Sequence, residues 1–297
     1  MDKIEKFLVS GGKIDVVVAS TTDLVEEARK IHDLSPTATA ALGRVLTIGV
    51  LMGSTLKSKK DTITIQIKGN GPIGGITVVV NQELEVKGYV YEPKVDIPVR
   101  EDGKLDVGRA VGQEGFLYVI KDLGLKEPYV ALSKLVTGEI AEDFANYFLI
   151  SEQKNTAVAL GVLVNKDGVK SSGGYMITAM PDATEEDISK IEEALKKAKP
   201  ISQMLDEEKS LLEIVKEITG AEEADIQKLE ERKPVYHCNC SKEKMERALV
   251  AIGKEELENI IQTDKKAEMR CQFCNKTYHF SEEELKKLQK EETKERN

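Results

Sequence analysis

Tryptophan is absent from this 297-residue sequence, and aromatic residues make up only 5% of it. Aliphatic side chains must therefore fill the core, and at 40% hydrophobic residues the chain has enough of them. Positive charge is also in the minority, because 43 lysines and arginines face 52 acidic residues and leave a formal charge of −9. Such a chain has no general basic surface for coating nucleic acid, so we expect no nucleic-acid partner.

Long hydrophobic segments are scarce as well. The longest apolar stretch, residues 38–53, contains Arg44 and falls short of a bilayer span. The first twenty residues do not read as a secretory signal, because glycines, Lys13 and Asp15 interrupt their apolar positions. We therefore expect a cytoplasmic protein without a membrane partner. Only four cysteines are present, and in a reducing compartment a few closely paired cysteines are typical of metal or redox sites.

Residues 1–180 are predicted to form one α+β domain dominated by a sheet. In residues 61–69, Ile63, Ile65 and Ile67 alternate with polar residues and share one face of a strand. Ser35 and Pro36 are typical of the first positions of a helix. The other expected strands are residues 14–20, 76–80, 84–91, 115–122 and 157–165, and the expected helices are residues 23–32, 35–53 and 139–152.

Residues 181–233 are predicted to form a helical linker. Thr184 and Asp187 have the spacing of a capping box, Pro200 breaks the first helix, and Gly220 ends the second. Isolated helices of this length are marginal in water, so their apolar stripe needs a surface to lie on. From the sequence alone, permanent packing and reversible docking both remain open. The stripe consists of Ile188, Ile191, Leu195, Ile201, Leu205, Leu211, Leu212, Val215 and Ile218.

Residues 234–297 contain all four cysteines and are predicted to form a small zinc domain. Cys238 and Cys240 are separated by one residue, thirty residues follow, and then come Cys271 and Cys274. Two short loops that each deliver two thiolates satisfy the four tetrahedral ligands that zinc prefers. Met245, Ala248, Leu249 and Ile252 suggest one helix between the pairs, residues 254–261 form a second, and the two offer only a small core. Metal binding would therefore supply much of the folding energy, about 10–16 kcal/mol in small zinc peptides.

Histidines and basic residues also lie near the cysteines in the sequence. His237 and His279 are less suited as ligands, because four thiolates are already available and His237 directly adjoins Cys238. Thiolates are the form of cysteine that peroxide attacks, and oxidised sulfurs no longer bind zinc. Four nearby basic residues were expected to stabilise the thiolates: Lys242, Lys244, Arg270 and Lys276.

Two other functions compete with a redox switch. A zinc-ribbon-like adaptor for protein or nucleic acid is the more common use of four cysteines, although ribbons ordinarily carry Cys-x-x-Cys on both sides. A thiol-disulfide oxidoreductase using Cys271 and Cys274 would need a thioredoxin-like βαβ setting, which this segment lacks. The sequence contains no Gly-x-Ser-x-Gly elbow and no His-Glu-x-x-His motif, so we expect no enzyme.

Six motifs resemble the heat shock protein 33 family, the redox-regulated 33 kDa chaperonins. They are "HDLSPTATAALGR" (32–44), "LKSKKDTITIQIKGNGPIGG" (56–75), "VKGYVYEP" (86–93), "SSGGYMITAMPDA" (171–183), "CNCSKEKMERAL" (238–249) and "CQFCNKTYHFSEEEL" (271–285). The resemblance extends over the whole chain. One departure is Thr178-Ala179-Met180-Pro181, where the resemblance leads us to expect Gln-Leu-Leu-Pro or a similar sequence; it lies at the end of the first domain and does not touch the thiol chemistry.

The resemblance implies an ATP-independent holdase that is inactive while reduced and bound to one zinc ion. Oxidation would form Cys238–Cys240 and Cys271–Cys274 disulfides, release the zinc, and unfold the zinc domain and linker. The exposed apolar surface would then hold unfolding client proteins during oxidative stress. The oxidised form would dimerise, and reduction would return it to the resting state.

Overall fold

The computed structural model describes residues 1–295 and has the mixed α+β architecture that the sequence predicts. The chain divides into two compact units, Met1–His237 and Cys238–Asn297. The linker belongs to the first of these units, and all four cysteines belong to the second. The three-part division at residues 180 and 233 stays a prediction.

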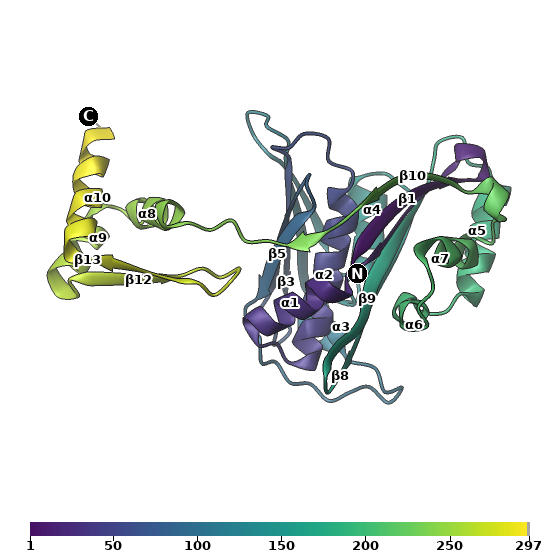
Figure 1. Cartoon of the computed structure of the whole chain (residues 1–297), viewed down its shortest axis with the longest axis horizontal. Helices are drawn as coiled ribbons and strands as arrows, with labels where there is room; N and C mark the ends of the chain where they lie inside the picture. The colour runs from purple at the N-terminus through teal and green to yellow at the C-terminus, as the bar shows by residue number, and fades with distance from the viewer. Residues whose placement is uncertain (296–297) are drawn as a thin grey trace. The chain divides into compact units, whose positions relative to one another are not determined.

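Two sheets build the first unit (Figure 1). Sheet A has the order β10 (Gln227–Arg232), β1 (Lys3–Val9), β2 (Ile14–Ser20), β9 (Gly168–Ala179) and β8 (Thr156–Asn165). Sheet B has the order β11 (Val235–Tyr236), β5 (Glu85–Val90), β4 (Ile76–Asn81), β3 (Thr62–Gly69), β6 (Gly115–Asp122) and β7 (Tyr129–Lys134). All neighbouring strands are antiparallel except β11 and β5, which are parallel.

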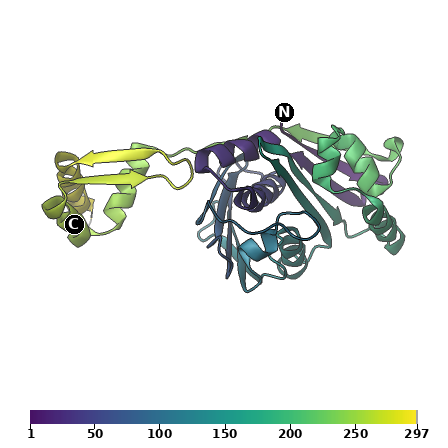
Figure 2. The same cartoon turned by 90° about the horizontal axis from the view of Figure 1, so that it is seen from below.

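Helix α2 (Pro36–Gly53) lies between the two sheets and forms the centre of the larger core (Figures 1 and 2). Ser35 caps it as predicted, with its Oγ accepting from the Ala38 N–H at 3.2 Å. Every residue of the helix except Pro36 and Arg44 is buried. The helix is long and apolar enough to cross a membrane by length and composition, but 89% of that stretch is buried inside the unit. It is therefore the core helix of this domain.

Shorter elements complete the first unit around this core. They are the 3₁₀ turn η1 (Ser10–Gly12), α1 (Thr22–His32), α3 (Val107–Val111) and α4 (Ala141–Ser151). The predicted strands and helices of this domain are confirmed in type, with small shifts at their ends. Strands β1, β7 and β9 and the short helix α3 were not predicted; in β1 the apolar residues mix with lysines, and β9 contains two adjacent glycines and two adjacent serines.

The face of sheet A that points away from α2 is covered by three linker helices, α5 (Glu185–Lys197), α6 (Ile201–Asp206) and α7 (Leu211–Thr219) (Figure 1). Strand β2 therefore has two buried faces. Val16 and Val18 belong to the core beneath the linker, whereas Val17 belongs to the core around α2. This double burial explains why residues 14–20 are apolar almost throughout instead of alternating.

The last part of the linker differs from the helical prediction. After the 3₁₀ turn η2 (Glu223–Asp225), residues Gln227–Arg232 form β10, which pairs with β1, and Val235–Tyr236 form β11, which pairs with β5. The sequence of β10 is too polar to form a helix with a buried stripe, and five of its six residues are exposed. A free sheet edge supplies its backbone with partners instead.

The second unit is small. It contains α8 (Lys242–Ala251), α9 (Lys254–Thr263), the hairpin of β12 (Lys266–Arg270) and β13 (Thr277–Ser281), and α10 (Glu282–Glu295). Helices α8 and α9 were predicted, and the hairpin was not. Its buried apolar side chains among the described residues are Leu249, Leu257, Ile261, Tyr278, Phe280, Leu285 and Leu288. So few buried side chains make a weak core for a unit of this length.

Candidate metal centre

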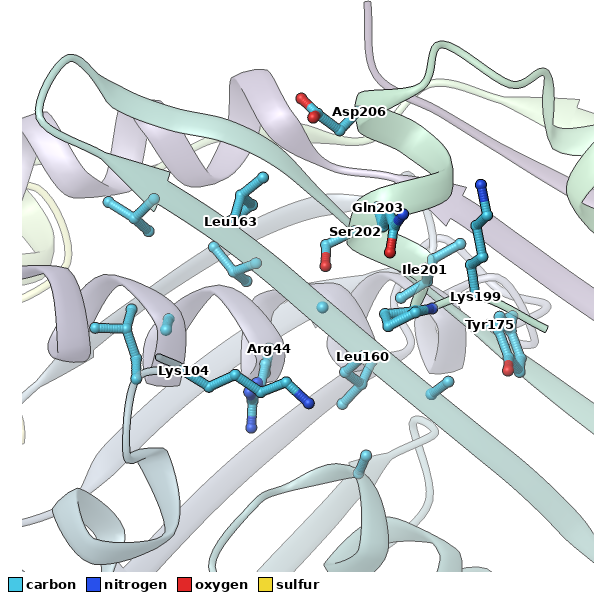
Figure 3. A pocket seen from close by; sticks show the side chains of 18 of the residues that line it. Arg44, Lys104, Leu160, Leu163, Tyr175, Lys199, Ile201, Ser202, Gln203 and Asp206 are labelled. Atoms are coloured by element: carbon cyan, nitrogen blue, oxygen red, sulfur yellow. The ribbon is translucent and has the colours of Figure 1, made fainter. Parts of the chain in front are cut away.

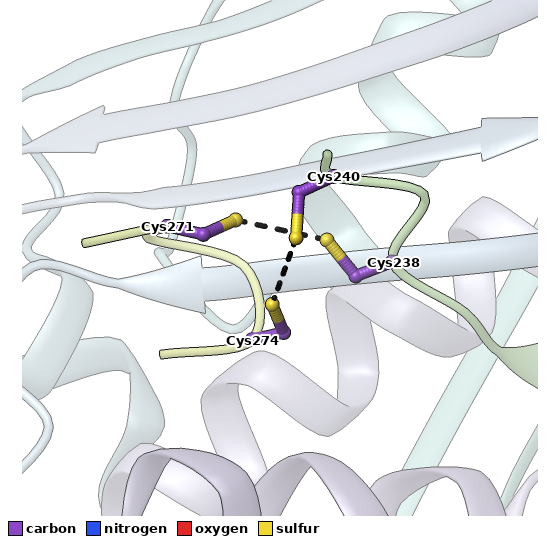
Figure 4. Close-up of side chains that lie close together, drawn as sticks. All are labelled: Cys238, Cys240, Cys271 and Cys274. Carbon is purple, nitrogen blue, oxygen red and sulfur yellow. Dashed lines mark hydrogen bonds between the residues drawn. The ribbon is translucent and has the colours of Figure 1, made fainter. Parts of the chain in front are cut away.

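The four cysteine sulfurs come together at one point of the second unit (Figure 4). All four lie within 4.8 Å of one another. The Sγ atoms of Cys240 and Cys274 are 3.3 Å apart, and those of Cys238 and Cys271 are 3.7 Å apart. A tetrahedral zinc with Zn–S bonds of about 2.3 Å separates its sulfurs by about 3.8 Å. The donor set and the spacing therefore fit a tetrahedral thiolate metal site.

Two short loops position the sulfurs. Cys238 and Cys240 immediately precede α8, whose first turn is capped by Ser241 accepting from the Lys244 N–H at 3.3 Å. Cys271 and Cys274 lie in the turn between β12 and β13. In that turn the Asn275 N–H donates to the Cys271 carbonyl at 2.8 Å, and Asn275 itself adopts a φ of 61°. Each loop thus holds its two sulfurs by its own backbone geometry.

Hydrogen-bond donors also converge on the sulfurs. The backbone N–H of Cys240 donates to Cys238, and the backbone N–H of Lys276 donates to Cys274. The Tyr278 hydroxyl donates to Cys240 Sγ at 3.1 Å. Donors of this kind stabilise sulfur in its negatively charged form, which is the form that binds metal.

The thiols do not all ionise alike without a cation. Burial raises the pKa of Cys238 and of Cys274 above the usual value for a thiol. Burial acts in the same direction at Cys240, but hydrogen bonds from Tyr278 and the neighbouring thiols lower its pKa to about 7. A bound cation would supply the positive charge that lets Cys238 and Cys274 ionise. Metal binding should therefore release protons and strengthen with rising pH.

The charged neighbours have other partners. The Lys242 ammonium pairs with Glu284 at 2.5 Å, and Lys244 Nζ donates to the Asn239 carbonyl at 2.7 Å. Both lysines were expected to stabilise the thiolates, and the structure directs their side chains elsewhere. Lys276 contributes through its backbone N–H, while its ammonium lies 5.2 Å from the centre of the Tyr278 ring.

Neither histidine joins the cluster, as the sequence analysis expected. Nδ1 of His237 lies 3.6 Å from a Glu85 carboxylate oxygen, and Nδ1 of His279 lies 3.4 Å from one of Glu268. Among the described residues, the four cysteines form the one group of histidines, cysteines and acids close enough to share a metal.

The linker stripe is the second functional element, and most of it lies on sheet A. Ile191, Ile201, Leu211, Val215 and Ile218 are buried against that sheet, and Leu195, Leu205 and Leu212 are half-buried there. Ile188 is half-buried on α5. The sequence analysis missed Met204 and Ile214, which are fully buried in the same core. Helical spacing could have found both, since each follows a buried residue by three positions.

The fold and the site together define a class of protein. A helix packs between two sheets, a linker covers the outer apolar face of one of these sheets, and the linker leads to a second unit with four clustered thiols.

The comparison with protein families identifies this class. The family model described as "Hsp33 protein" matches residues 2–281. The chain therefore belongs to the Hsp33 family, and this membership supports a chaperone function.

Individual relatives match over nearly their whole length. The 33 kDa chaperonin of Clostridioides difficile is 48% identical over 290 residues, covering 98% of this chain and 99% of that protein. The 33 kDa chaperonin of Clostridium beijerinckii is 46% identical over 288 residues, covering 97% and 98%. The crystal structure of the 33 kDa chaperonin of Thermotoga maritima has a TM-score of 0.90 at 39% identity, covering 98% of this chain and 99% of that one.

Proposed function

We propose that this chain is a redox-regulated, ATP-independent holdase chaperone that is inactive when reduced and zinc-bound. The observation that carries the proposal is a covalent connection. The helices that cover the apolar face of sheet A belong to the same segment that ends, through β10 and β11, at Cys238. A change of structure at the cysteines can therefore act on the covering segment.

Zinc is the metal we propose, because four thiolate donors at tetrahedral spacing favour it over harder cations. When bound, it keeps the sulfurs as thiolates and adds about 10–16 kcal/mol to the folding of a small unit. The second unit needs such a contribution, because its buried core is small. Cys238, Cys240, Cys271 and Cys274 would be the ligands.

Oxidation would remove these ligands. For each cysteine pair, two thiolates, one hydrogen peroxide and two protons give one disulfide and two water molecules. We propose the pairs Cys238–Cys240 and Cys271–Cys274. The sulfur pairs that lie 3.3 and 3.7 Å apart instead belong to different loops. Disulfides between the loops would lock the unit shut, whereas disulfides within each loop leave the loops unconnected and let the unit open.

Opening of the second unit would release the linker from sheet A. The uncovered core includes Phe7, Val16, Val18, Tyr175 and Ile177 of the sheet, together with the linker's own stripe. A contiguous apolar surface of this kind can bind unfolding client proteins without ATP and can also bring two oxidised chains together. We propose this holding activity in the cytoplasm, with no enzymatic reaction and no nucleic-acid or membrane partner.

The test follows zinc, thiols and activity together. The reduced protein is treated with hydrogen peroxide at mildly raised temperature, and a sample kept in reductant is the control. We expect loss of one zinc per chain, loss of four thiols, and suppression of aggregation of thermally unfolding citrate synthase only after oxidation. Peptide mapping should find the two disulfides within the loops. Zinc release without any suppression would refute the chaperone proposal, and salt-sensitive nucleic-acid binding by the reduced protein would support the adaptor alternative.

A further inference from the structure

Strand β10 occupies one edge of sheet A. It pairs antiparallel with β1 from Ile4 opposite Arg232 to Leu8 opposite Gln227, with an irregularity at Leu229. No side chain of β10 is buried, and Leu229 is 46% exposed. Its side chains contact the sheet through ion pairs such as that of Lys228 Nζ with Glu5 Oε1, at 3.0 Å. The edge of β1 thus accepts a strand mainly through the main chain.

The packing around β10 is loose. A hollow of about 440 Å³ lies between β1, β10 and the start of α7, lined among others by Phe7, Leu212 and Ile226. The linker helices, by contrast, bury fully enclosed side chains such as Met204 and Ile214. Of the linker elements on sheet A, β10 is therefore the one held with the least buried apolar surface.

The position of β10 in the chain links it to the cysteines. Five residues separate Arg232 from Cys238, and the one secondary-structure element among them is the two-residue strand β11. Tyr236 anchors β11 by donating its hydroxyl to the Gly88 carbonyl at 2.9 Å. A chain loosened at Cys238 would therefore separate from sheet B at β11 and then from sheet A at β10, before the helices come off.

Removal of β10 would leave the outer main-chain groups of β1 without partners. Unpaired groups at a sheet edge are a template for another extended strand. β1 also separates the two apolar cores, with Ile4 in the core around α2 and Phe7 and Val9 in the core beneath the linker. A strand added here would lie next to the face that the linker helices uncover.

We propose that the edge of β1 vacated by β10 captures clients by strand addition. The partner is an extended segment of an unfolding polypeptide, paired main chain to main chain along Ile4–Leu8. This proposal rests on the proposed function, because β10 must leave with the linker when the protein is oxidised. Main-chain pairing makes little demand on client sequence, which suits a holdase for many proteins.

The opposite edge of sheet A serves as an internal comparison. Strand β8 lines an open hollow of about 850 Å³ together with α6, and Leu160, Leu163 and Ile201 lie along it (Figure 3). That hollow exists while the linker is docked. Access to it therefore does not require oxidation, whereas access to the edge of β1 does.

The test measures residue-resolved amide hydrogen exchange in the oxidised full-length chain, with and without unfolding citrate synthase. We expect the β1 amides that face β10 to exchange faster after oxidation and to slow again by at least about tenfold when the client is bound. The β1 amides paired with β2 should stay protected throughout. Suppressed aggregation with unchanged exchange at β1, or with protection gained at β8 instead, would overturn the inference and leave the proposed function intact.

A competition assay tests the main-chain part of the inference. A synthetic peptide of residues 225–234, in about hundredfold excess, should lower aggregation suppression by the oxidised chain at least about twofold. The matched control is the same peptide with N-methyl groups on residues 227–232, which keeps every side chain and removes the main-chain donors. Equal inhibition by both peptides would refute strand addition. Absence of any suppression before peptide is added would instead refute the proposed function.

Discussion

Replacement of Ile218 by alanine tests whether linker docking sets the threshold for activation. Ile218 lies on α7, is fully buried against sheet A, and is remote in sequence from the cysteines. Truncation of a buried isoleucine to alanine costs about 2–5 kcal/mol. A loss of about 3 kcal/mol raises the ratio of released to docked linker about 150-fold, since each 1.4 kcal/mol is a factor of ten.

We therefore expect the reduced, zinc-bound Ile218→Ala variant to show faster amide exchange in α5–α7 by about two orders of magnitude. Its zinc content should stay at one per chain, because the second unit is untouched. Aggregation suppression should appear after a shorter exposure to peroxide than in the parent chain.

The matched control is Ile252→Ala, the same chemical change at a side chain that is 46% exposed. It should change stability by no more than about 0.5 kcal/mol and leave activation unchanged. Linker exchange and activation rate in Ile218→Ala that equal those of the parent chain would refute the reasoning, because docking of the stripe would then not hold the protein inactive.

Three further predictions concern other parts of the chain. Cys271→Ser should lose stoichiometric zinc and broaden unfolding of residues 238–297 even in reductant, as measured by metal content and thermal melting; full zinc with a sharp transition would show the ligand assignment to be wrong. Tyr236→Phe removes a buried hydroxyl that is hydrogen-bonded to Gly88. This change should lower the free energy of local opening at β11 by about 1–2 kcal/mol, which amide exchange would show as faster exchange, with zinc content unchanged. The hydrogen bond from Arg29, opposed by burial, lowers the pKa of Glu26 from 4.5 to about 2, so its contribution to stability is present above pH 4.5 and lost as pH falls toward 2. The difference in unfolding free energy between the parent chain and Glu26→Gln should shrink over that range in denaturant titrations, and a constant difference would contradict the assignment.

Local pattern was sufficient for much of the fold. Helix α2 and strand β3 were predictable because the cap at Ser35 and the alternation of Ile63, Ile65 and Ile67 are local signals that tertiary packing reinforces. The clustering of the four cysteines was predictable for a similar reason. One residue separates Cys238 from Cys240 and two separate Cys271 from Cys274, so each pair of sulfurs is fixed on a single loop. Proximity of the sulfurs is confirmed, while the metal and the disulfide pairs stay proposals.

The features that sequence missed depend on distant partners. Strand β10 carries no apolar alternation, and only the free edge of β1 makes its residues extended. The partners of Lys242 and Lys244 were not predicted, because nearness in sequence does not determine which acceptor an ammonium reaches, and both have oxygen partners close by. Met204 and Ile214 lie three positions after Ile201 and Leu211, so helical spacing allows both to be buried, but the width of the buried face is set by the distant sheet.

The pairing of Ile4 with Arg232 also determines when sheet A of a newly synthesised chain can be completed. Some 230 residues must be translated after Ile4 before its strand partner exists, which takes roughly 10–45 seconds at 5–20 residues per second. During that interval a nascent chain on the ribosome carries an uncapped first strand, and the segment that caps it is among the last parts of the unit to emerge.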